Sequence, residues 1–584
     1  MSQPHQRVSG ASGRRSSRVR AIVAGIAAAV CWLVAAGYAQ AQDIAAAAIG
    51  PVARAQIAAL LAEKEARTPA QQKIDSRLLL TIDARRPLSR FPVLHSLARP
   101  LPEADGRVIV DIDLFDGDAV ADVVAVLVQA GAEVVSTSAR FRAIRARVDP
   151  RELETVAAAP NVRFIQSRQE FDTNKNTTSE GDVTHRADLA RSTYGYTGAG
   201  QKVCAISDGV DSLAGRQATG DLPAVVDILP GQAGSGDEGA AMLEIIHDLA
   251  PGARLGYATA HGGVAAFAQN VLDLADPAKG ACGIIVDDIS YSVESPFQDG
   301  AVAQAVNTVT ATGVAYFSSA ANSGNLDSGN SGVWEGTFNA PGALTSGLIP
   351  GHVLHEFAPG VTQNVALDTA PHVALHWADP AGASTTDYDL YVLNAAGTAI
   401  LASSTNTQNG TQNPFEYTGA SSTYPAGSRV IVARKTGEPH VMFWVNWYRG
   451  VLTHGTAGAT KGHSAASNAF SVAATPVNAP GPYPGVFSGS DVVEPFSSDG
   501  PRRIFFDFDG NLLPGAPAGN FTSSGGVVRL KPDITAADGV ATSTSGFNPF
   551  FGTSAAAPHA AAIAALLKQA FPAWSLAQLR TALV

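Results

Sequence analysis

From Gly198 onward the chain alternates apolar strand patterns with helical patterns, and this alternation is the strongest constraint on its fold. The strands are short runs such as KVCAIS at 202–207 and GIIVDDIS at 283–290. The segments between them, such as EGAAMLEIIHDLA at 238–250, carry apolar residues at helical spacing. Strands that are apolar throughout are typical of a parallel sheet covered by helices on both faces. The sequence therefore predicts an α/β fold with three layers around a parallel sheet.

A second pattern interrupts this one between about residues 344 and 450. Here short alternating strands are separated by turn residues, which is typical of an antiparallel β-sandwich. We therefore predict a sandwich at 344–450 that is inserted into an α/β domain made of residues 198–343 and 451–584.

The region before the α/β domain divides into three parts. Residues 101–168 follow the order strand, helix, strand, strand, helix, strand, which predicts a small βαββαβ domain. Residues 169–197 are polar and lack periodicity, so an exposed linker is expected. Residues 42–100 are rich in Ala, Arg and Pro and predict a linker or a loosely attached leader.

The first 41 residues have the composition of a secretory signal peptide. Arginines precede a run without charged residues from Ala21 to Ala39, and Ala39-Gln40-Ala41 fits a small-residue cleavage site. We expect cleavage after Ala41 and a secreted or periplasmic protein without a stable membrane span. An uncleaved anchor is the alternative, because the run is just long enough to cross a bilayer.

Charge and cysteine content exclude several classes of protein. Residues 1–41 contain five arginines and no acidic residue. Subtracting their charge from the net charge of −11 leaves −16 for residues 42–584. This acidity argues against nucleic acid as a partner. The three cysteines, Cys31, Cys204 and Cys282, are too few for a disulfide framework and none has zinc-site spacing. Cys204 and Cys282 can pair in an oxidising compartment or remain buried thiols.

The strongest chemical signal is the segment GTSAAAPH at 552–559, a turn of small residues that leads into an Ala-rich helix. A serine at a helix N-terminus gains from the helix dipole and from free backbone N–H groups that can stabilise an oxyanion. Ser554 is therefore a candidate nucleophile. A helix cap is the alternative role for a serine at this place.

Further segments, in order along residues 198–584, resemble the subtilase family of serine peptidases. They are GAGQKVCAISDGVD for the strand with the catalytic acid, DEGAAMLEIIHDLAPGARL for the helix with the base, GVAYFSSAANSG for the oxyanion asparagine, then GHSAASNAFSVAATP, FSSDGP, KPDITA and GTSAAAPH. The resemblance implies that Ser554 is the nucleophile and that Asn322 and the backbone N–H of Ser554 form the oxyanion hole. It also implies that Ser290, Tyr291 and Ser292 bind the substrate backbone as an added strand, and that the βαββαβ domain is similar to the inhibitory propeptides of such enzymes.

The position of the general base departs from the family, because Glu238 stands where subtilases have a histidine. His247 lies nine residues further on the same helix, half a turn away from the face of Glu238. His261 and His559 also lie outside the expected place. A histidine base elsewhere in the chain remains a further alternative.

A glutamate base is similar to that of the sedolisins, which resemble subtilases in fold and share the serine motif. Their partner aspartate follows the glutamate by four residues, where this chain has Met242. The partner is therefore expected at the subtilase position, which favours Asp208 with Asp211 as the fallback. An ungapped match to the family places Ser207, not Asp208, at the position of the aspartate. Neighbouring side chains of a strand point to opposite faces, so a bulge at the strand end is needed to turn Asp208 toward the base.

Together these features predict a secreted serine endopeptidase, made as a zymogen, with polypeptide substrates and its own propeptide as partners. Two adjacent carboxylates that share a proton predict an acidic activity optimum. The alternative is a catalytically inactive binding protein of the same fold. No cofactor or metal is required. Asp387-Tyr388-Asp389 could supply calcium ligands or form the solvated face of a strand.

Overall fold

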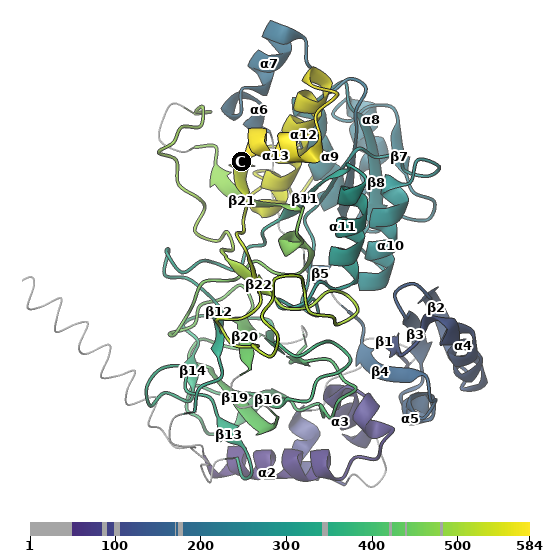
Figure 1. Cartoon of the computed structure of the whole chain (residues 1–584), viewed down its shortest axis with the longest axis vertical. Helices are drawn as coiled ribbons and strands as arrows, with labels where there is room; N and C mark the ends of the chain where they lie inside the picture. The colour runs from purple at the N-terminus through teal and green to yellow at the C-terminus, as the bar shows by residue number, and fades with distance from the viewer. Residues whose placement is uncertain are drawn as a thin grey trace, which may run out of the picture.

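The computed structural model describes residues 50–84, 90–97, 106–169, 171–172, 179–340, 349–419, 423–437, 441–478 and 483–584. The predicted signal peptide, residues 1–41, lies outside these ranges. Figure 1 shows an α/β layered part, a β-sandwich beside it and a small α+β domain at one side. Among the helices of the described ranges, none combines the length and the apolar character needed to cross a membrane.

Seven parallel strands form the central sheet, which confirms the predicted α/β fold. Their order across the sheet is β24-β21-β11-β9-β6-β8-β7. Their bounds are β6 Lys202–Ser207, β7 Val226–Ile228, β8 Arg254–Thr259, β9 Ile284–Asp287, β11 Ala315–Ser319, β21 Phe470–Pro476 and β24 Ile534–Asp538. These strands are buried along most of their length because helices cover both faces of the sheet.

The two faces of the sheet carry separate hydrophobic cores. Val203 and Val286 pack with α9 (Glu238–Leu249) and α12 (Thr553–Ala570), whereas Ile206 and Ile285 pack with α10 (Val264–Ala275) and α11 (Ala301–Ala311). Side chains alternate between the faces along each strand. The remaining helices of this part are α6 Gly181–Thr184, α7 Ala187–Tyr194, α8 Leu213–Thr219 and α13 Leu576–Leu583.

Cys204 and Cys282 form a disulfide with a Cα–Cα distance of 6.1 Å. The bond joins β6 to the segment that precedes β9, on the α10 and α11 side of the sheet. Of the two alternatives, the structure therefore contains the pair.

The small domain contains one antiparallel sheet with two helices. Its elements are β1 Val108–Leu114, α4 Val120–Gln129, β2 Glu133–Ser138, β3 Ala143–Val148, α5 Leu153–Ala157 and β4 Val162–Ser167. The strand order is β2-β3-β1-β4. Apolar side chains of β1, such as Val110 and Ile112, pack against Leu127 of α4 and Val156 of α5.

The sandwich begins at Val333, earlier than the predicted boundary at 344. One sheet contains β12 Val333–Thr337, β20 Met442–Trp447, β15 Val373–Trp377 and β18 Phe415–Tyr417. The other contains β13 Val353–Leu354, β19 Arg429–Thr436, β16 Asp387–Leu393 and β17 Ile400–Ser404, with β14 Asn364–Val365 beside β19. Phe297 and Phe505 enter its core from outside the insert, and a two-stranded sheet, β22 Arg502–Ile504 and β23 Val527–Arg529, lies outside the insert in the chain.

Residues 51–84 correct the prediction of a linker, because they form α2 (Pro51–Glu65) and α3 (Ser76–Ala84). Both helices lie against the sandwich (Figure 1). Lys64 of α2 is buried, and its Nζ lies 2.8 Å from Asp387 Oδ1 and 2.6 Å from Asp389 Oδ1. The two carboxylates are therefore not a solvated face, and Lys64 supplies the positive charge that a calcium ion would bring.

Lys64→Met is expected to lower the free energy of unfolding by about 3–5 kcal/mol, because it removes the ammonium from two buried carboxylates and leaves His352 Nε2, 2.9 Å from Asp389 Oδ2, as the remaining basic group there. Lys435→Met is the matched control. Lys435 pairs with the exposed Glu65, and loss of such a surface pair costs about 1 kcal/mol or less. Urea unfolding of both variants measures the difference. Equal effects of the two substitutions would show that the contacts of Lys64 with Asp387 and Asp389 are not what holds residues 51–84 to the sandwich.

Candidate active site

Ser554 is the second residue of α12 and is completely buried. The N-cap of this helix is Gly552, whose N–H donates to Asp538 Oδ2 at 2.9 Å. The Ser554 hydroxyl makes no hydrogen bond to any residue that the structure describes. Since a buried hydroxyl normally has a partner, this side chain does not serve as a helix cap. Its position instead suits a group that reacts.

Asn322 lies just after β11, in the turn that faces the start of α12. Its Oδ1 accepts hydrogen bonds from the N–H of Thr553 at 3.1 Å and from Thr553 Oγ1 at 2.8 Å. These bonds fix the amide next to Ser554 and leave Nδ2 as the donor group of the side chain. Such a donor can stabilise a developing oxyanion.

Glu238 is the first residue of α9 and is completely buried. Helix α9 packs against α12 on one face of the sheet. The first turn of α9 lies close to the sheet, because a Cβ atom on Gly239 would be 2.4 Å from the ring of Tyr257 in β8. Glycine therefore lets the first turn of α9, and with it Glu238, approach the sheet closely.

Asp208 follows the last residue of β6, and its carboxylate faces the first N–H groups of α9. Its Oδ1 accepts hydrogen bonds from the N–H groups of Glu238 at 2.9 Å, Gly239 at 3.3 Å and Gly209 at 2.5 Å. Burial raises the pKa of Asp208, and these three hydrogen bonds oppose the rise. The fallback residue, Asp211, instead accepts a bond from the N–H of Gly236. Of the two aspartates, Asp208 is thus the one hydrogen-bonded to Glu238, and the donor is the backbone N–H of Glu238.

Asp288, which the sequence analysis did not single out, contributes a second buried carboxyl beside Glu238. It follows β9 and is 1% exposed. Burial raises the pKa of Asp288 well above its ordinary value, and the charge and hydrogen bond of the adjacent Glu238 carboxyl raise it further, as does the charge of Asp208. The Ser207 hydroxyl acts in the opposite direction and lowers this pKa. Burial and the neighbouring carboxyls thus act in the same direction on Asp288, toward a higher pKa.

The signal for Asp288 is the Asp-Asp pair at the end of an apolar strand. Neighbouring side chains of a strand point to opposite faces, so one of the two acids is expected on each side of the sheet. Asp287 accordingly lies on the opposite side, where His463 Nε2 is 3.0 Å from its Oδ1. Burial lowers the pKa of His463, but the carboxylates of Glu294 and Asp287 raise it to about 10. This histidine is therefore a charged partner of two acids.

None of the three histidines that were candidates for the base, His559, His247 and His261, which all lie in the described ranges, bonds the Ser554 hydroxyl. His559 Nδ1 lies 2.7 Å from the carbonyl oxygen of Ala555, and its Nε2 lies 3.3 Å from Ser179 Oγ. His247 is partly buried on α9, and burial lowers its pKa. His261 Nε2 lies 3.2 Å from the carbonyl oxygen of Ser235, and its charge lowers the pKa of Asp208. Of these three histidines, His261 is the one whose charge acts on Asp208.

The predicted substrate strand already has a neighbour in the chain. Residues Ser290–Tyr291 form β10, which pairs antiparallel with β5 (Phe171–Asp172), with Ser290 opposite Asp172. The Tyr291 hydroxyl donates to the carbonyl oxygen of Ala260 at 2.6 Å, and Ser292 Oγ lies 3.1 Å from His372 Nε2 of the sandwich. The side chains of Tyr291 and Ser292 are thus used in internal contacts, and the backbone of β10 is the part that binds a strand.

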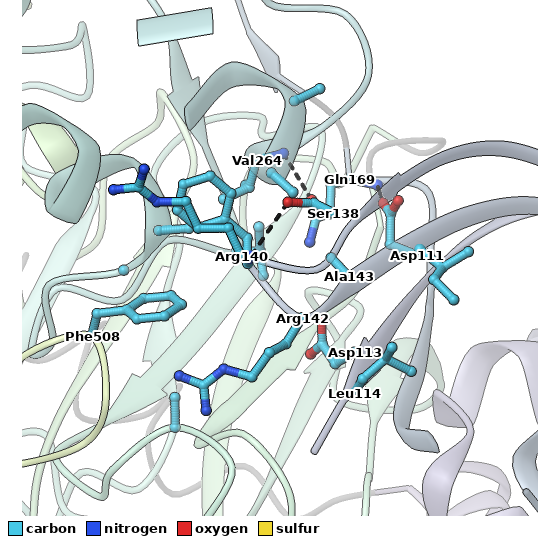
Figure 2. A pocket seen from close by; sticks show the side chains of 18 of the residues that line it. Asp111, Asp113, Leu114, Ser138, Arg140, Arg142, Ala143, Gln169, Val264 and Phe508 are labelled. Carbon is cyan, nitrogen blue, oxygen red and sulfur yellow. Dashed lines mark hydrogen bonds between the residues drawn. The ribbon is translucent and has the colours of Figure 1, made fainter. Parts of the chain in front are cut away.

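A cavity of about 810 Å³ lies elsewhere, between the small domain, α10 and the sandwich. Figure 2 shows Arg140 and Arg142 of the small domain beside Phe508 at this cavity. The guanidinium of Arg142 lies 5.2 Å from the centre of the Phe508 ring and also pairs with Asp509. Ser554 and Glu238 do not line it. In the described ranges, no cluster of three His, Cys, Asp or Glu side chains could hold a metal ion.

Comparison with known proteins gives one match to a family. Residues 376–584 match the model of the subtilase family, and no curated protein matches the chain. Among solved structures, the chain is similar to the CspB protease of Clostridium perfringens, with 13% identity, 66% of this chain and 86% of that chain covered, and a TM-score of 0.40. It is also similar to fervidolysin from Fervidobacterium pennivorans, a keratinolytic enzyme related to subtilisin, with 11% identity, coverage of 81% and 56%, and a TM-score of 0.34. The family match includes Ser554 and supports a serine peptidase in general.

Proposed function

We propose that this chain is a secreted serine endopeptidase, made as a zymogen, in which Ser554 is the nucleophile and Glu238 is the general base. The observation that supports the proposal most is that the two residues lie in the first turns of two helices that pack on each other. Ser554, with a hydroxyl that has no partner in the described part of the chain, begins α12, and the buried Glu238 begins the adjoining α9. A nucleophile and a buried base on neighbouring elements are what acyl transfer requires.

The proposed reaction has two halves. Ser554 Oγ attacks the carbonyl carbon of the peptide bond while its proton passes to the Glu238 carboxylate, and the carbonyl electrons move to the oxygen. The Nδ2 of Asn322 and the N–H of Ser554 stabilise this oxyanion. When the C–N bond breaks, Glu238 returns the proton to the leaving amine. Water then attacks the acyl ester with Glu238 again as base, and Ser554 regains its proton.

Asp208 has a positioning role in this proposal. Its hydrogen bonds to the N–H groups of Glu238 and Gly239 fix the first turn of α9, and this turn sets the direction of the Glu238 side chain. A carboxylate also stabilises the N-terminus of a helix. Asp208 thus acts through the backbone of the base, where an orienting aspartate normally bonds the base side chain.

The zymogen part of the proposal draws on the antiparallel pairing of β5 with β10. This pairing occupies the strand edge that a substrate backbone would use. Beyond it, the segment from Ser179 packs on the α/β part. Glu180 Oε2 accepts the N–H of Ala541, and His185 Nε2 accepts the N–H of Ala537. An exposed linker is where proteolysis concentrates, so we expect cleavage between about Ser167 and Arg191, and these contacts favour a site before Ser179.

N-terminal sequencing of the secreted protein tests this maturation site. The expected first residue lies between Arg168 and Ser179, because removal of residues beyond Ser179 would break contacts that hold the α/β part together. The Ser554→Ala variant serves as the control, since it cannot process itself and should keep residues from Gln42 onward. A wild-type protein that begins only near Gln42 would contradict maturation by this route.

The proposed activity is tested by incubating the matured protein with an unfolded polypeptide between about pH 3 and pH 9, a range that includes the carboxyl and imidazole reference pKa values. We expect internal peptide bonds to be cut at mildly acidic to neutral pH. Absence of cleavage over the whole range would favour the alternative, an inactive binding protein. That alternative is supported by the loss of the usual histidine at the position of Glu238.

A further inference from the structure

We propose that Asp288 is the positioning partner of the Glu238 side chain, and that the two buried carboxyls share one proton during catalysis. The inference rests on the proposed function and names a residue that neither the sequence motifs nor the family match assigns. In this arrangement Asp288 carries the proton and donates a hydrogen bond through it to the Glu238 carboxylate. The Glu238 carboxylate is thereby held in its base form.

The position of Asp288 follows from the alternation of β9. Val286 belongs to the core shared with α9 and α12, whereas Ile285 and the neighbouring Asp287 face the other side of the sheet. Asp288, two residues after Val286, therefore lies on the side of Glu238 and Ser554. Both carboxyls are almost fully buried, with exposures of 1% for Asp288 and 0% for Glu238. They also lie at the carboxyl ends of parallel strands, where α/β proteins place their active sites.

Two carboxyls in contact at a buried place cannot both be charged without a large penalty. One proton between them leaves the pair with a charge of −1. When Ser554 gives up its proton the pair becomes neutral, and it returns to −1 when the leaving amine takes that proton. The pair thus alternates between a charge of −1 and a neutral state, and both are tolerated at a buried site. A carboxyl dyad of this kind titrates as a unit.

Other polar groups face the pair and are part of its environment. Asp208 lies on one side, after β6, and its charge favours retention of the shared proton. Burial raises the pKa of the Tyr257 hydroxyl in β8, and the charges of Asp208 and Asp288 raise it further. The Ser207 hydroxyl favours ionisation of Asp288, and His261 favours ionisation of Asp208.

The first test is the pH profile of kcat/KM in Asp288→Asn and Asp288→Ala. Asparagine donates an N–H to Glu238 at every pH, so the decline of activity at high pH should move upward by one pH unit or more, with kcat within about tenfold of the wild type. Alanine offers no donor, and kcat should fall about 10²-fold. Glu244→Gln is the matched control, because Glu244 is buried on the same helix and bonds Ser543 and Thr544. Its profile should not move.

The second test detects the proton without any activity. Infrared spectra of the full-length Ser554→Ala protein at neutral pH are compared with those of variants that also carry Asp288→Asn, Glu238→Gln or both. A shared proton predicts that each single substitution removes the absorption of one protonated carboxyl, and that the double substitution removes no more than one. Losses that add to two, or no loss at all, would overturn the shared proton.

If Asp288→Asn is not secreted, thermal unfolding supplies the decision. A retained proton makes the folded protein less stable as pH rises through neutrality. Glu238→Gln in the Ser554→Ala protein should reduce this slope, and equal slopes would contradict the inference. An inactive wild-type protein with a shared proton would refute only the proposed function. An active protein in which Asp288→Asn leaves the pH profile unchanged would refute only the role of Asp288.

Discussion

Ser554→Ala is expected to abolish peptide hydrolysis, lowering kcat by a factor on the order of 10⁵ or more, because no acyl-enzyme can form without the hydroxyl. The substitution removes a buried oxygen that has no hydrogen-bond partner in the described part of the chain. Folding and secretion should therefore be unchanged. Turnover of a fluorogenic peptide, normalised to the amount of secreted protein, measures the effect.

Ser471→Ala provides the matched control for this prediction. Ser471 is a buried serine of β21, and its hydroxyl bonds Ser464 at 2.8 Å. Its loss should affect stability slightly and leave turnover close to that of the wild type. A Ser554→Ala protein that still hydrolyses peptides at the wild-type rate would place the nucleophile elsewhere.

Glu238→Gln is expected to lower kcat by about 10²- to 10⁴-fold, the contribution of a positioned general base. Glutamine has nearly the same shape but cannot accept the serine proton. The bond from the Glu238 N–H to Asp208 does not involve the side chain, so the start of α9 should persist. The measurement is kcat/KM between about pH 3 and pH 9, with Glu244→Gln as the control for a buried carboxyl of the same helix.

The pH dependence separates the two possible kinds of base. An ordinary glutamate has a pKa of about 4.3 and an ordinary histidine about 6.5, so a carboxylate base should keep its activity at a pH where an imidazole is protonated. The activity should decline at high pH, since loss of the shared proton leaves two like charges next to Ser554. His261→Gln tests the alternative directly. If this variant and not Glu238→Gln removes activity, a histidine is the base.

The parallel sheet and the main candidate residues could be predicted from the sequence because their signals are local. Apolar strands indicate a sheet covered on both faces, and the turn of small residues before α12 identifies Ser554 within eight residues of sequence. Glu238 is equally visible, since it occupies a position in a recognisable helix. Each of these depends on residues that are neighbours along the chain.

What could not be predicted depends on contacts between distant residues. The helix α2 has a weak apolar pattern, and its attachment needs Lys64 to meet Asp387, 323 positions further along the chain. Asp288 gained no role from the sequence because the side of the sheet that it faces is fixed only when the register of β9 is known. The choice of Asp208 over Asp211 likewise depends on the conformation of the turn after β6. The sandwich begins at Val333, before the part of the sequence in which short alternating strands can be recognised.

Activation of Ser554 by the Glu238 carboxylate can be measured without a substrate. A fluorophosphonate labels an activated serine, and mass spectrometry follows the rate of this labelling at each pH in the matured protein and in its Glu238→Gln variant. If Glu238 is the base, labelling should occur at residue 554 alone, with a rate already near its maximum at about pH 6, below the histidine reference value, and the variant should lose at least 10²-fold of this rate. A rate that rises through pH 6 to 7 and survives Glu238→Gln would contradict this role of Glu238.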